Sequence, residues 1–321
     1  MSVMPAEASG TRSKYDRLIA AAQKVPVVPT LVVHPCDESS LRGAVEAAQA
    51  GIIKPILVGP AAKIRDTAAR HNLNIASFDV VDVPHSEAAA AKAVEMIHQG
   101  KGEALMKGSL HTDELMRSVT AKAGGLRTSR RVSHVFIMDV PAYADTVFVT
   151  DAAINIFPDL DAKRDIIQNA IDLYNQAGFG ATPRVAILSA VETVTSAIPS
   201  TIEAAALCKM ADRGQITGAL LDGPLAFDNA IDPEAARIKG IKSEVAGRAQ
   251  ILVVPDLESG NMLAKNLAYF AKADGAGIVL GARVPIVLTS RADSARARMA
   301  SAAVAALFAN ARRRVTPIAA A

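Results

Sequence analysis

The sequence contains no tryptophan and few aromatic residues of any kind. Aromatic side chains make up 4% of the 321 residues, which leaves few platforms for stacking nucleic-acid bases. The charges nearly balance, with 35 lysine and arginine residues against 32 aspartate and glutamate residues, so a strongly basic footprint is also missing. We therefore expect no nucleic-acid partner.

Cysteine is equally scarce. Cys36 and Cys208 lie far apart and belong to no CxxC motif, so they cannot build a disulfide framework or a cysteine-rich zinc site. The first residues have no apolar core of a secretory signal, and the longest uncharged stretch near the end, 299–311, is shorter than a membrane span. These features predict a cytoplasmic protein without a membrane segment.

Short apolar runs alternate with alanine-rich stretches of helical periodicity along nearly the whole chain. The expected strands are 27–33, 55–58, 135–138, 147–150, 185–188, 219–221, 251–254 and 285–288, and the expected helices are 38–50, 86–99, 161–177, 200–212, 258–273 and 293–313. Strands that are apolar throughout and separated by helices form parallel-rich sheets with helices on both faces. The pattern predicts the α/β class.

In open α/β sheets, ligands lie at the carboxyl ends of the strands, so the loops there are the first places to search. Four of these loops are polar or glycine-rich: 106–112, 221–225, 254–261 and 288–294. In the last, Ser290 and Arg291 end a strand, and Asp293 or Ser294 is placed to cap the next helix. A hydroxyl, a guanidinium and free N–H groups at a helix start can bind an anion. The alternative is that Asp293 only caps and Arg291 pairs with a surface carboxylate.

A second cationic loop contains Lys107, Ser109 and Thr112. Thr112 is placed to cap a helix whose second turn carries Arg117, and Gly108 permits a close backbone approach. Two cationic loops suit a substrate that carries phosphate, although an ordinary capped helix with a solvated arginine would give the same pattern.

Other patterns are less specific or missing. The run of arginines over 127–131 is either a solvated face or a contact for a polyphosphate. The chain has no GxxxxGK[ST] and no HExxH motif, and its six histidines have no metal-ligand spacing. The string Gly275-Ala276-Gly277 precedes its expected strand, the wrong order for a dinucleotide fingerprint. We expect no metal site and no covalent intermediate.

Five strings of the second half, taken together, resemble the phosphate acetyltransferase and phosphate butyryltransferase family. They are LSAVE (188–192), LDGPLAFDNAI (221–231), KGIKSEVAG (239–247), VPDLESGNMLAKNLAYF (254–270) and GARVPIVLTSRADS (281–294). The first half agrees more loosely through ILVGP (56–60), ALMKGSLHTDELMR (104–117), RVSHVFIMDVP (131–141) and DAAINIFPD (151–159). Five long strings in order are more specific than any single motif.

The resemblance implies a two-domain α/β fold similar to that of isocitrate and isopropylmalate dehydrogenases, with the active site in the interdomain cleft. Residues 1–12 would be a disordered N-terminus, residues 13–140 and 283–321 would form domain I, and residues 141–282 would form an inserted domain II. It also implies a homodimer that transfers a short acyl group, acetyl or butyryl, reversibly between coenzyme A and inorganic phosphate. In this reaction the coenzyme A thiolate attacks the acyl phosphate directly, and no cofactor or metal takes part.

The resemblance also assigns roles to residues. Arg291 would bind the phosphoryl group and Ser290 would donate to the tetrahedral intermediate. Acetyl-specific members carry an aspartate further along the helix, where this chain has Arg296 and Arg298, so Asp293 is the only nearby candidate base and the two arginines are expected to be solvated. The candidates for binding substrate are Lys107, Ser109, Thr112, Arg117 and Arg131.

Two other functions remain open. A transacetylase-like domain can sense acetyl-coenzyme A without turning it over, although Ser290 and Arg291 are intact in this chain. A dehydrogenase on the same fold would need a nucleotide fingerprint or clustered metal carboxylates, which the sequence lacks.

Because aromatics are few, we expect the phosphates of coenzyme A and the shape of the cleft, rather than an aromatic clamp, to hold this substrate.

Overall fold

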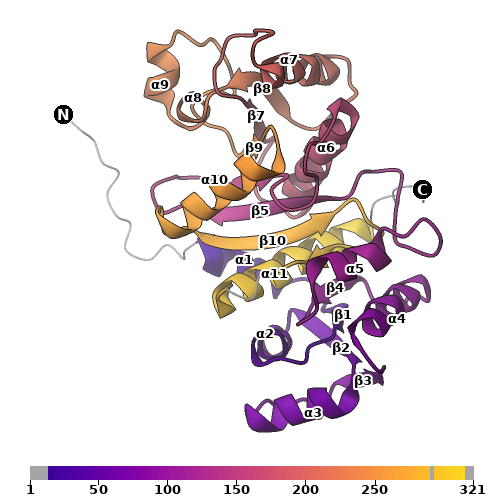
Figure 1. Ribbon diagram of the computed structural model, residues 1–321. Helices are drawn as coiled ribbons and strands as arrows, with labels where there is room; N and C mark the ends of the chain where they lie inside the picture. The colour runs from indigo at the N-terminus through magenta and orange to yellow at the C-terminus, as the bar shows by residue number, and fades with distance from the viewer. Residues whose placement is uncertain (1–13, 290–292, 315–321) are drawn as a thin grey trace, which may run out of the picture.

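The computed structural model describes residues 14–289 and 293–314, so the expectations for residues 1–12, Ser290 and Arg291 lie outside it. The strands of this described part form an 11-stranded sheet in the order β3-β2-β1-β4-β11-β10-β5-β6-β9-β7-β8, with helices on both faces (Figure 1). Most neighbouring strands are parallel, whereas β5 and β10 run antiparallel to their partners. The predicted α/β class with a parallel-rich sheet is confirmed.

The strands are β1 (Val28–Val33), β2 (Ile53–Gly59), β3 (Asp79–Asp82), β4 (Ala104–Lys107), β5 (Ser133–Asp139), β6 (Val147–Thr150), β7 (Arg184–Leu188), β8 (Leu220–Leu225), β9 (Ile251–Val253), β10 (Asp274–Leu280) and β11 (Ile286–Val287). The helices are α1 (Lys14–Ala22), α2 (Glu38–Gln49), α3 (Ala61–Arg70), α4 (Ser86–His98), α5 (Thr112–Val119), α6 (Leu160–Gln176), α7 (Pro199–Asp212), α8 (Phe227–Ile231), α9 (Pro233–Ile238), α10 (Leu257–Tyr269) and α11 (Ala295–Arg312).

Strand β10 corrects one of the sequence expectations. Gly275 and Gly277 lie inside this strand rather than before it. Glycine is depleted in strands, so the low β-propensity of this segment did not predict a strand. It forms because its backbone pairs along its whole length with β5, from Asp274 opposite Asp139 to Leu280 opposite Ser133.

The two faces of the sheet are covered differently. On one face, helices α2, α3, α6, α7 and α11 pack into a continuous apolar core. On the other face the core is divided, with α4 and α5 over the N-terminal strands and α8, α9 and α10 over the C-terminal strands. Strands β5 and β10 run between these two groups, which is where Figure 1 shows α5 and α10 on either side of them.

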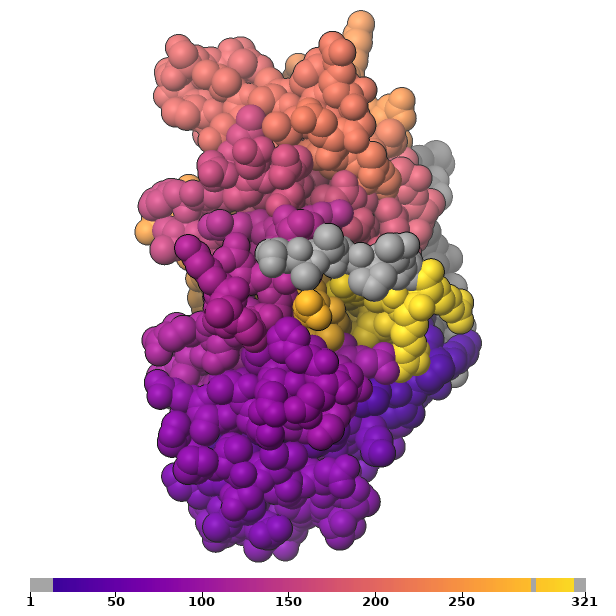
Figure 2. Space-filling view, turned by 90° about the vertical axis from the view of Figure 1, so that its right-hand side faces the viewer, coloured from indigo at the N-terminus to yellow at the C-terminus, as the bar shows by residue number. Residues whose placement is uncertain are grey.

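Helix α11 brings the end of the chain back to its beginning. It packs on β10, β1, β4, α1 and α2, and Asn310 donates to the carbonyl of Pro26 at 2.8 Å. In Figure 2 it lies between a lower part built from the N-terminal strands and helices and an upper part that contains α6 to α9. The division into domains at 140 and 283 stays a prediction. Within the described residues, no helix combines the length and the apolar composition that crossing a membrane requires.

Candidate active site

A cavity of about 640 Å³ lies where the core of the second face is divided. Its floor comes from β5 and β10, and its walls come from the start of α5, the inner side of α10 and the start of α11. A volume of this size is within the range of small-molecule sites. Of the predicted site residues in the described part, Lys107, Thr112 and Asp293 line it, whereas Ser109, Arg117 and Arg131 do not.

The register of four adjacent strands determines what faces the cavity. Val287 of β11 is opposite Met106 of β4, so the next residues, Leu288 and Lys107, are neighbours. Leu288 donates its N–H to the carbonyl of Gly277 in β10, and Gly277 is opposite Phe136 in β5. A single row across the sheet therefore runs from a cationic end at Lys107 to an apolar end at Phe136.

Lys107 is held in place by its own loop. The residue is 7% exposed, and Nζ donates to the carbonyl oxygen of Gly108 at 3.3 Å. The N–H of Gly108 donates to the carbonyl of Val33 at 2.8 Å, which ties the end of β4 to the end of β1. The hydroxyl of Ser109 donates to the carbonyl of His34 at 2.8 Å, so this serine fastens the loop rather than facing the cavity.

Helix α5 opens directly on the cavity. The prediction that Thr112 caps this helix is wrong, because His111 occupies the extended cap position and Thr112 is the first helical residue. The side chain of His111 makes no capping hydrogen bond, so within the described residues the N–H groups at this helix start can bind an anion. His111 and Thr112 both line the cavity.

The start of α11 forms the opposite wall. Ser294 is the cap, and its Oγ accepts from the N–H of Ala297 at 3.1 Å. Of the two alternatives for this cap, the structure therefore selects Ser294, and the carboxylate of Asp293 is not needed for capping. Thr289 and Asp293, which flank the predicted catalytic pair Ser290 and Arg291, both line the cavity.

The expectation that Arg298 is solvated is wrong, whereas Arg296 is exposed as expected. Arg298 is buried, and its Nη1 donates to Oγ1 of Thr289 at 3.0 Å. Arg296 forms an ion pair with Asp274 at 2.7 Å, and its guanidinium lies 3.7 Å from the ring centroid of Tyr15. Both arginines fix α11 against the strand ends, since each contacts a residue on or beside the sheet.

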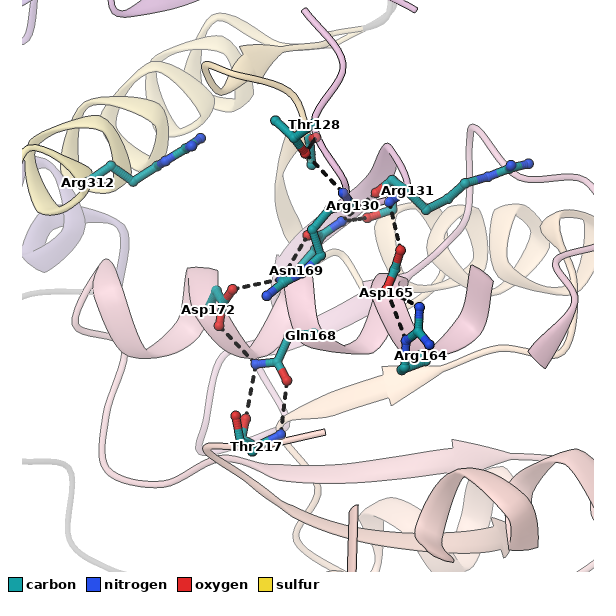
Figure 3. A network of polar contacts seen from close by, with 12 residues as sticks. Thr128, Arg130, Arg131, Arg164, Asp165, Gln168, Asn169, Asp172, Thr217 and Arg312 are labelled. Carbon is teal, nitrogen blue, oxygen red and sulfur yellow. Dashed lines mark hydrogen bonds and ion pairs between the residues drawn. The ribbon is translucent and has the colours of Figure 1, made fainter. Parts of the chain in front are cut away.

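Arg117 and Arg131 lie outside the cavity. Arg117 is 71% exposed, and its nearest carboxylate oxygens, on Asp113 and Glu87, are 3.7 and 3.8 Å away. Figure 3 shows that Arg130 turns toward Asp172 on α6, with which it pairs at 2.9 Å, while the side chain of Arg131 extends in another direction.

The side chain of Arg131 has a partner of its own. Its Nε donates to Oδ1 of Asn155 at 2.8 Å, and Asn155 in turn donates to the carbonyl of Val132 at 2.9 Å. The guanidinium is therefore held at the surface by a buried amide. It keeps further N–H groups with which a phosphate can pair.

The two thiols are poor nucleophiles. Burial raises the pKa of Cys36 to about 11 and the pKa of Cys208 to about 12. Both thiols are protonated at neutral pH, and only the thiolate attacks efficiently. Among the described residues, no three histidine, cysteine, aspartate or glutamate side chains come together in a way that could hold a metal ion.

Several lining residues lie outside the four loops that the sequence pointed to: His134, Phe136 and Met138 on β5, and Lys265 and Tyr269 on α10. Asn261 and Thr289 also line the cavity, and they belong to two of those loops, 254–261 and 288–294. The three on β5 follow the period-two alternation of a strand, so their common face was accessible from the sequence. Nothing in the sequence indicated that this face lines a cavity rather than a closed core.

A buried lysine and an uncapped helix start, at the ends of parallel strands, are features of α/β enzymes that bind phosphate-carrying substrates. The family model described as phosphate acetyl/butaryl transferase matches residues 87–306. The chain belongs to this family of phosphate acyltransferases.

Relatives in the family are similar over nearly their whole length. The phosphate acetyltransferase of Rhizobium meliloti is 72% identical over 308 residues, which are 96% of this chain and 97% of that protein. The phosphate butyryltransferase of Clostridium beijerinckii is 40% identical over 295 residues, which are 92% of this chain and 97% of that protein.

Solved structures agree with this assignment. A branched-chain phosphotransacylase from Enterococcus faecalis V583 superimposes with a TM-score of 0.76 at 27% identity, covering 88% of this chain and 99% of that one. A 4-hydroxythreonine-4-phosphate dehydrogenase from Klebsiella pneumoniae matches with a TM-score of 0.54 at 13% identity, and the match covers 88% of this chain and 99% of that one. The second match concerns the fold alone, and it agrees with the predicted dehydrogenase-like architecture.

Proposed function

We propose that the cavity is the active site at which this chain transfers a short acyl group, acetyl or butyryl, reversibly between coenzyme A and inorganic phosphate. The observation that carries the proposal is the buried Lys107 beside the uncapped start of α5, which together offer a cation and N–H donors to a phosphate. The family supports the same reaction, since its members carry acetyl and butyryl transferase names.

The reaction needs no covalent enzyme intermediate. The sulfur of the coenzyme A thiolate attacks the carbonyl carbon of the acyl phosphate and forms the C–S bond. The bond from that carbon to the phosphate oxygen breaks, and phosphate leaves with the electron pair. The site accelerates this step by holding both substrates together and by stabilising charge with fixed donors.

Every predicted site residue except Ser109 has a role in this proposal. Lys107 and Thr112 bind the phosphate at the cationic end of the row, and Asp293 accepts the thiol proton. Ser290 and Arg291, in the segment between two cavity-lining residues, donate to the oxyanion and bind the phosphoryl group. Arg117 and Arg131 hold the outer phosphates of coenzyme A, which is too long for the cavity alone.

One assay tests the reaction. Purified protein with acetyl phosphate and coenzyme A is expected to produce thioester absorbance without NAD or added metal, and to keep its rate when EDTA is present. Rates with propionyl and butyryl phosphate then rank the acyl groups. If none of the three acyl phosphates gives thioester while acetyl-coenzyme A still binds, the sensor function replaces the enzyme.

We also propose that the chain works in the cytoplasm as a homodimer, paired through the outer side of α10. Met262 and Phe270 on this side are exposed apolar residues, and Phe270 is 85% exposed. Ile156 and Phe157 are exposed as well, and the carbonyl of Ile156 accepts from the N–H of Leu257 at the start of α10. Apolar groups gathered in this way mark a protein interface.

Replacing Phe270 by aspartate is expected to weaken the dimer about 100-fold, because a charge would lie in the apolar contact. Light scattering after size-exclusion chromatography measures the mass at micromolar concentration. The control is Ile238→Asp on α9, an equally apolar and 71% exposed position away from α10. A wild-type protein that elutes as a monomer would refute the pairing.

A further inference from the structure

His134 is a buried side chain for which the proposed reaction has so far no use. It belongs to β5, is 1% exposed and lines the cavity. Its backbone carbonyl accepts from Oγ1 of Thr150 at 2.8 Å, and its ring packs edge-on against Phe136 with 4.3 Å between the ring centroids. The ring is therefore held firmly, yet its Nδ1 has no hydrogen-bond partner among the described residues.

The surroundings keep this imidazole neutral. Burial lowers the pKa of His134 to about 3, so the ring carries one proton throughout the neutral range. The charged groups that line the same cavity are Lys107 on β4, Lys265 on α10, Asp274 on β10 and Asp293 before α11. The cause of the low pKa of His134 is burial and not the charge of any of these four groups.

The unpartnered Nδ1 indicates where the single hydrogen lies. A buried N–H without a partner costs about 1–3 kcal/mol, and orphaned N–H groups are rarer than unused acceptors. Nδ1 is therefore the bare acceptor and Nε2 carries the hydrogen. Nε2 lies over Gly277, where an added Cβ would be 3.0 Å from it, and Gly277 itself lines the cavity.

The cavity has an apolar end around this donor. Phe136 and Met138 share the face of β5 with His134, and Ala264 and Ala268 of α10 line the same cavity. Lys107 lies at the other end of the row, separated from Phe136 by the positions of Leu288 and Gly277. A charged phosphate fits the lysine end, whereas the uncharged acyl group fits the end where a neutral donor is available.

We propose that His134 donates a hydrogen bond from Nε2 to the carbonyl oxygen of the acyl group, and so orients and polarises that carbonyl for attack. This inference rests on the proposed function. A neutral donor stabilises the negative charge that develops on the oxygen without attracting the phosphate to the wrong end of the cavity. His134 is a donor and not the base for the thiol, because its free lone pair faces the packed interior.

Three substitutions separate this role from packing. The amide nitrogen of glutamine reaches about as far as Nε2, that of asparagine about as far as Nδ1, and phenylalanine fills the space without a donor. His134→Phe and His134→Asn are expected to lower kcat about 100-fold with little change in KM for coenzyme A, and His134→Gln to recover most of that loss. Equal kcat for His134→Phe and the wild type would overturn the inference, as would a His134→Asn variant better than His134→Gln.

The tautomer is tested independently of activity. In protein labelled with ¹⁵N and ¹³C at histidine, the signal that disappears in His134→Phe is assigned to His134. We expect this signal to show the Nε2–H tautomer and to stay unchanged between pH 5 and 8. An Nδ1–H tautomer, or a titration within that range, would refute the inference even in an active enzyme. A wild-type protein that forms no thioester would instead refute the proposed function, while the spectrum would still report the state of the ring.

Discussion

Replacing Lys107 by methionine is expected to lower kcat/KM for the acyl phosphate about 100- to 1000-fold. The lysine is 7% exposed and is the cation at one end of the row that lines the cavity. A fixed charge that meets the phosphate in a water-poor site stabilises it far more than a solvated charge would, and removing one such donor typically costs a rate factor of this size. Methionine keeps the length and the apolar stem of the side chain, so the decrease in kcat/KM measures the contribution of the ammonium group.

The measurement is steady-state kinetics with acetyl phosphate varied at saturating coenzyme A. Lys101→Met serves as the control, because Lys101 is exposed and precedes the same strand without reaching the cavity. It is expected to stay within about 2-fold of the wild type, as surface substitutions usually do. A Lys107→Met variant with near-normal kcat/KM would place the phosphate site elsewhere.

Replacing Gly108 by alanine is expected to destabilise the fold by about 3 kcal/mol and to remove activity with it. A Cβ at this position would lie closer than 3.0 Å to the backbone oxygens of Val33 and His34, a separation that real Cβ atoms essentially never show. Both oxygens belong to the backbone at the end of β1, so they cannot relieve the steric clash by changing rotamer as a side chain can. The ends of β1 and β4 must separate, and Lys107 loses its position.

Urea unfolding of both variants at equilibrium gives the change in free energy. The control is Gly100→Ala, where φ is +71° and no atom lies within 4 Å of the added Cβ. This control carries only the backbone cost of the left-handed conformation, about 1 kcal/mol. If Gly108→Ala unfolds at the same urea concentration as the control, the close approach of Gly108 to the backbone of Val33 and His34 does not stabilise the loop after β4.

Local periodicity was enough to predict the main helices. The expected helix 161–177 corresponds to α6 at Leu160–Gln176, and the expected helix 86–99 corresponds to α4 at Ser86–His98. Helices can be predicted from local sequence because their hydrogen bonds join residues only four positions apart. Strands β3 and β4 were not among the expected strands. β3 (DVVD) begins and ends with aspartate and β4 (ALMK) contains no β-branched or aromatic residue, so both have low β-propensity and depend on pairing with neighbouring strands.

The candidate site was predicted in part, for the same physical reason. Loops that follow strands can be recognised locally, and Lys107, Thr112 and Asp293 were found in this way and line the cavity. Ser109 was proposed as a substrate contact from its position in the loop, yet its hydroxyl bonds to His34 across a sequence separation of 75 residues. Because His34 is so distant in the sequence, no pattern within the loop could predict this hydrogen bond.

The amino-acid sequence by itself determined the α/β class, the alternation of strands and helices, and the cationic loops at strand ends, since each follows from residues close together in the chain. The tertiary structure alone decided which of these loops meet. Lys107 and Phe136 share one row only because β4, β11, β10 and β5 pair in a particular register, although β11 and β10 come from the far end of the chain. The same pairing buries His134 at the edge of a cavity. Burial and partnership of this kind depend on contacts between distant segments, which composition and periodicity do not encode.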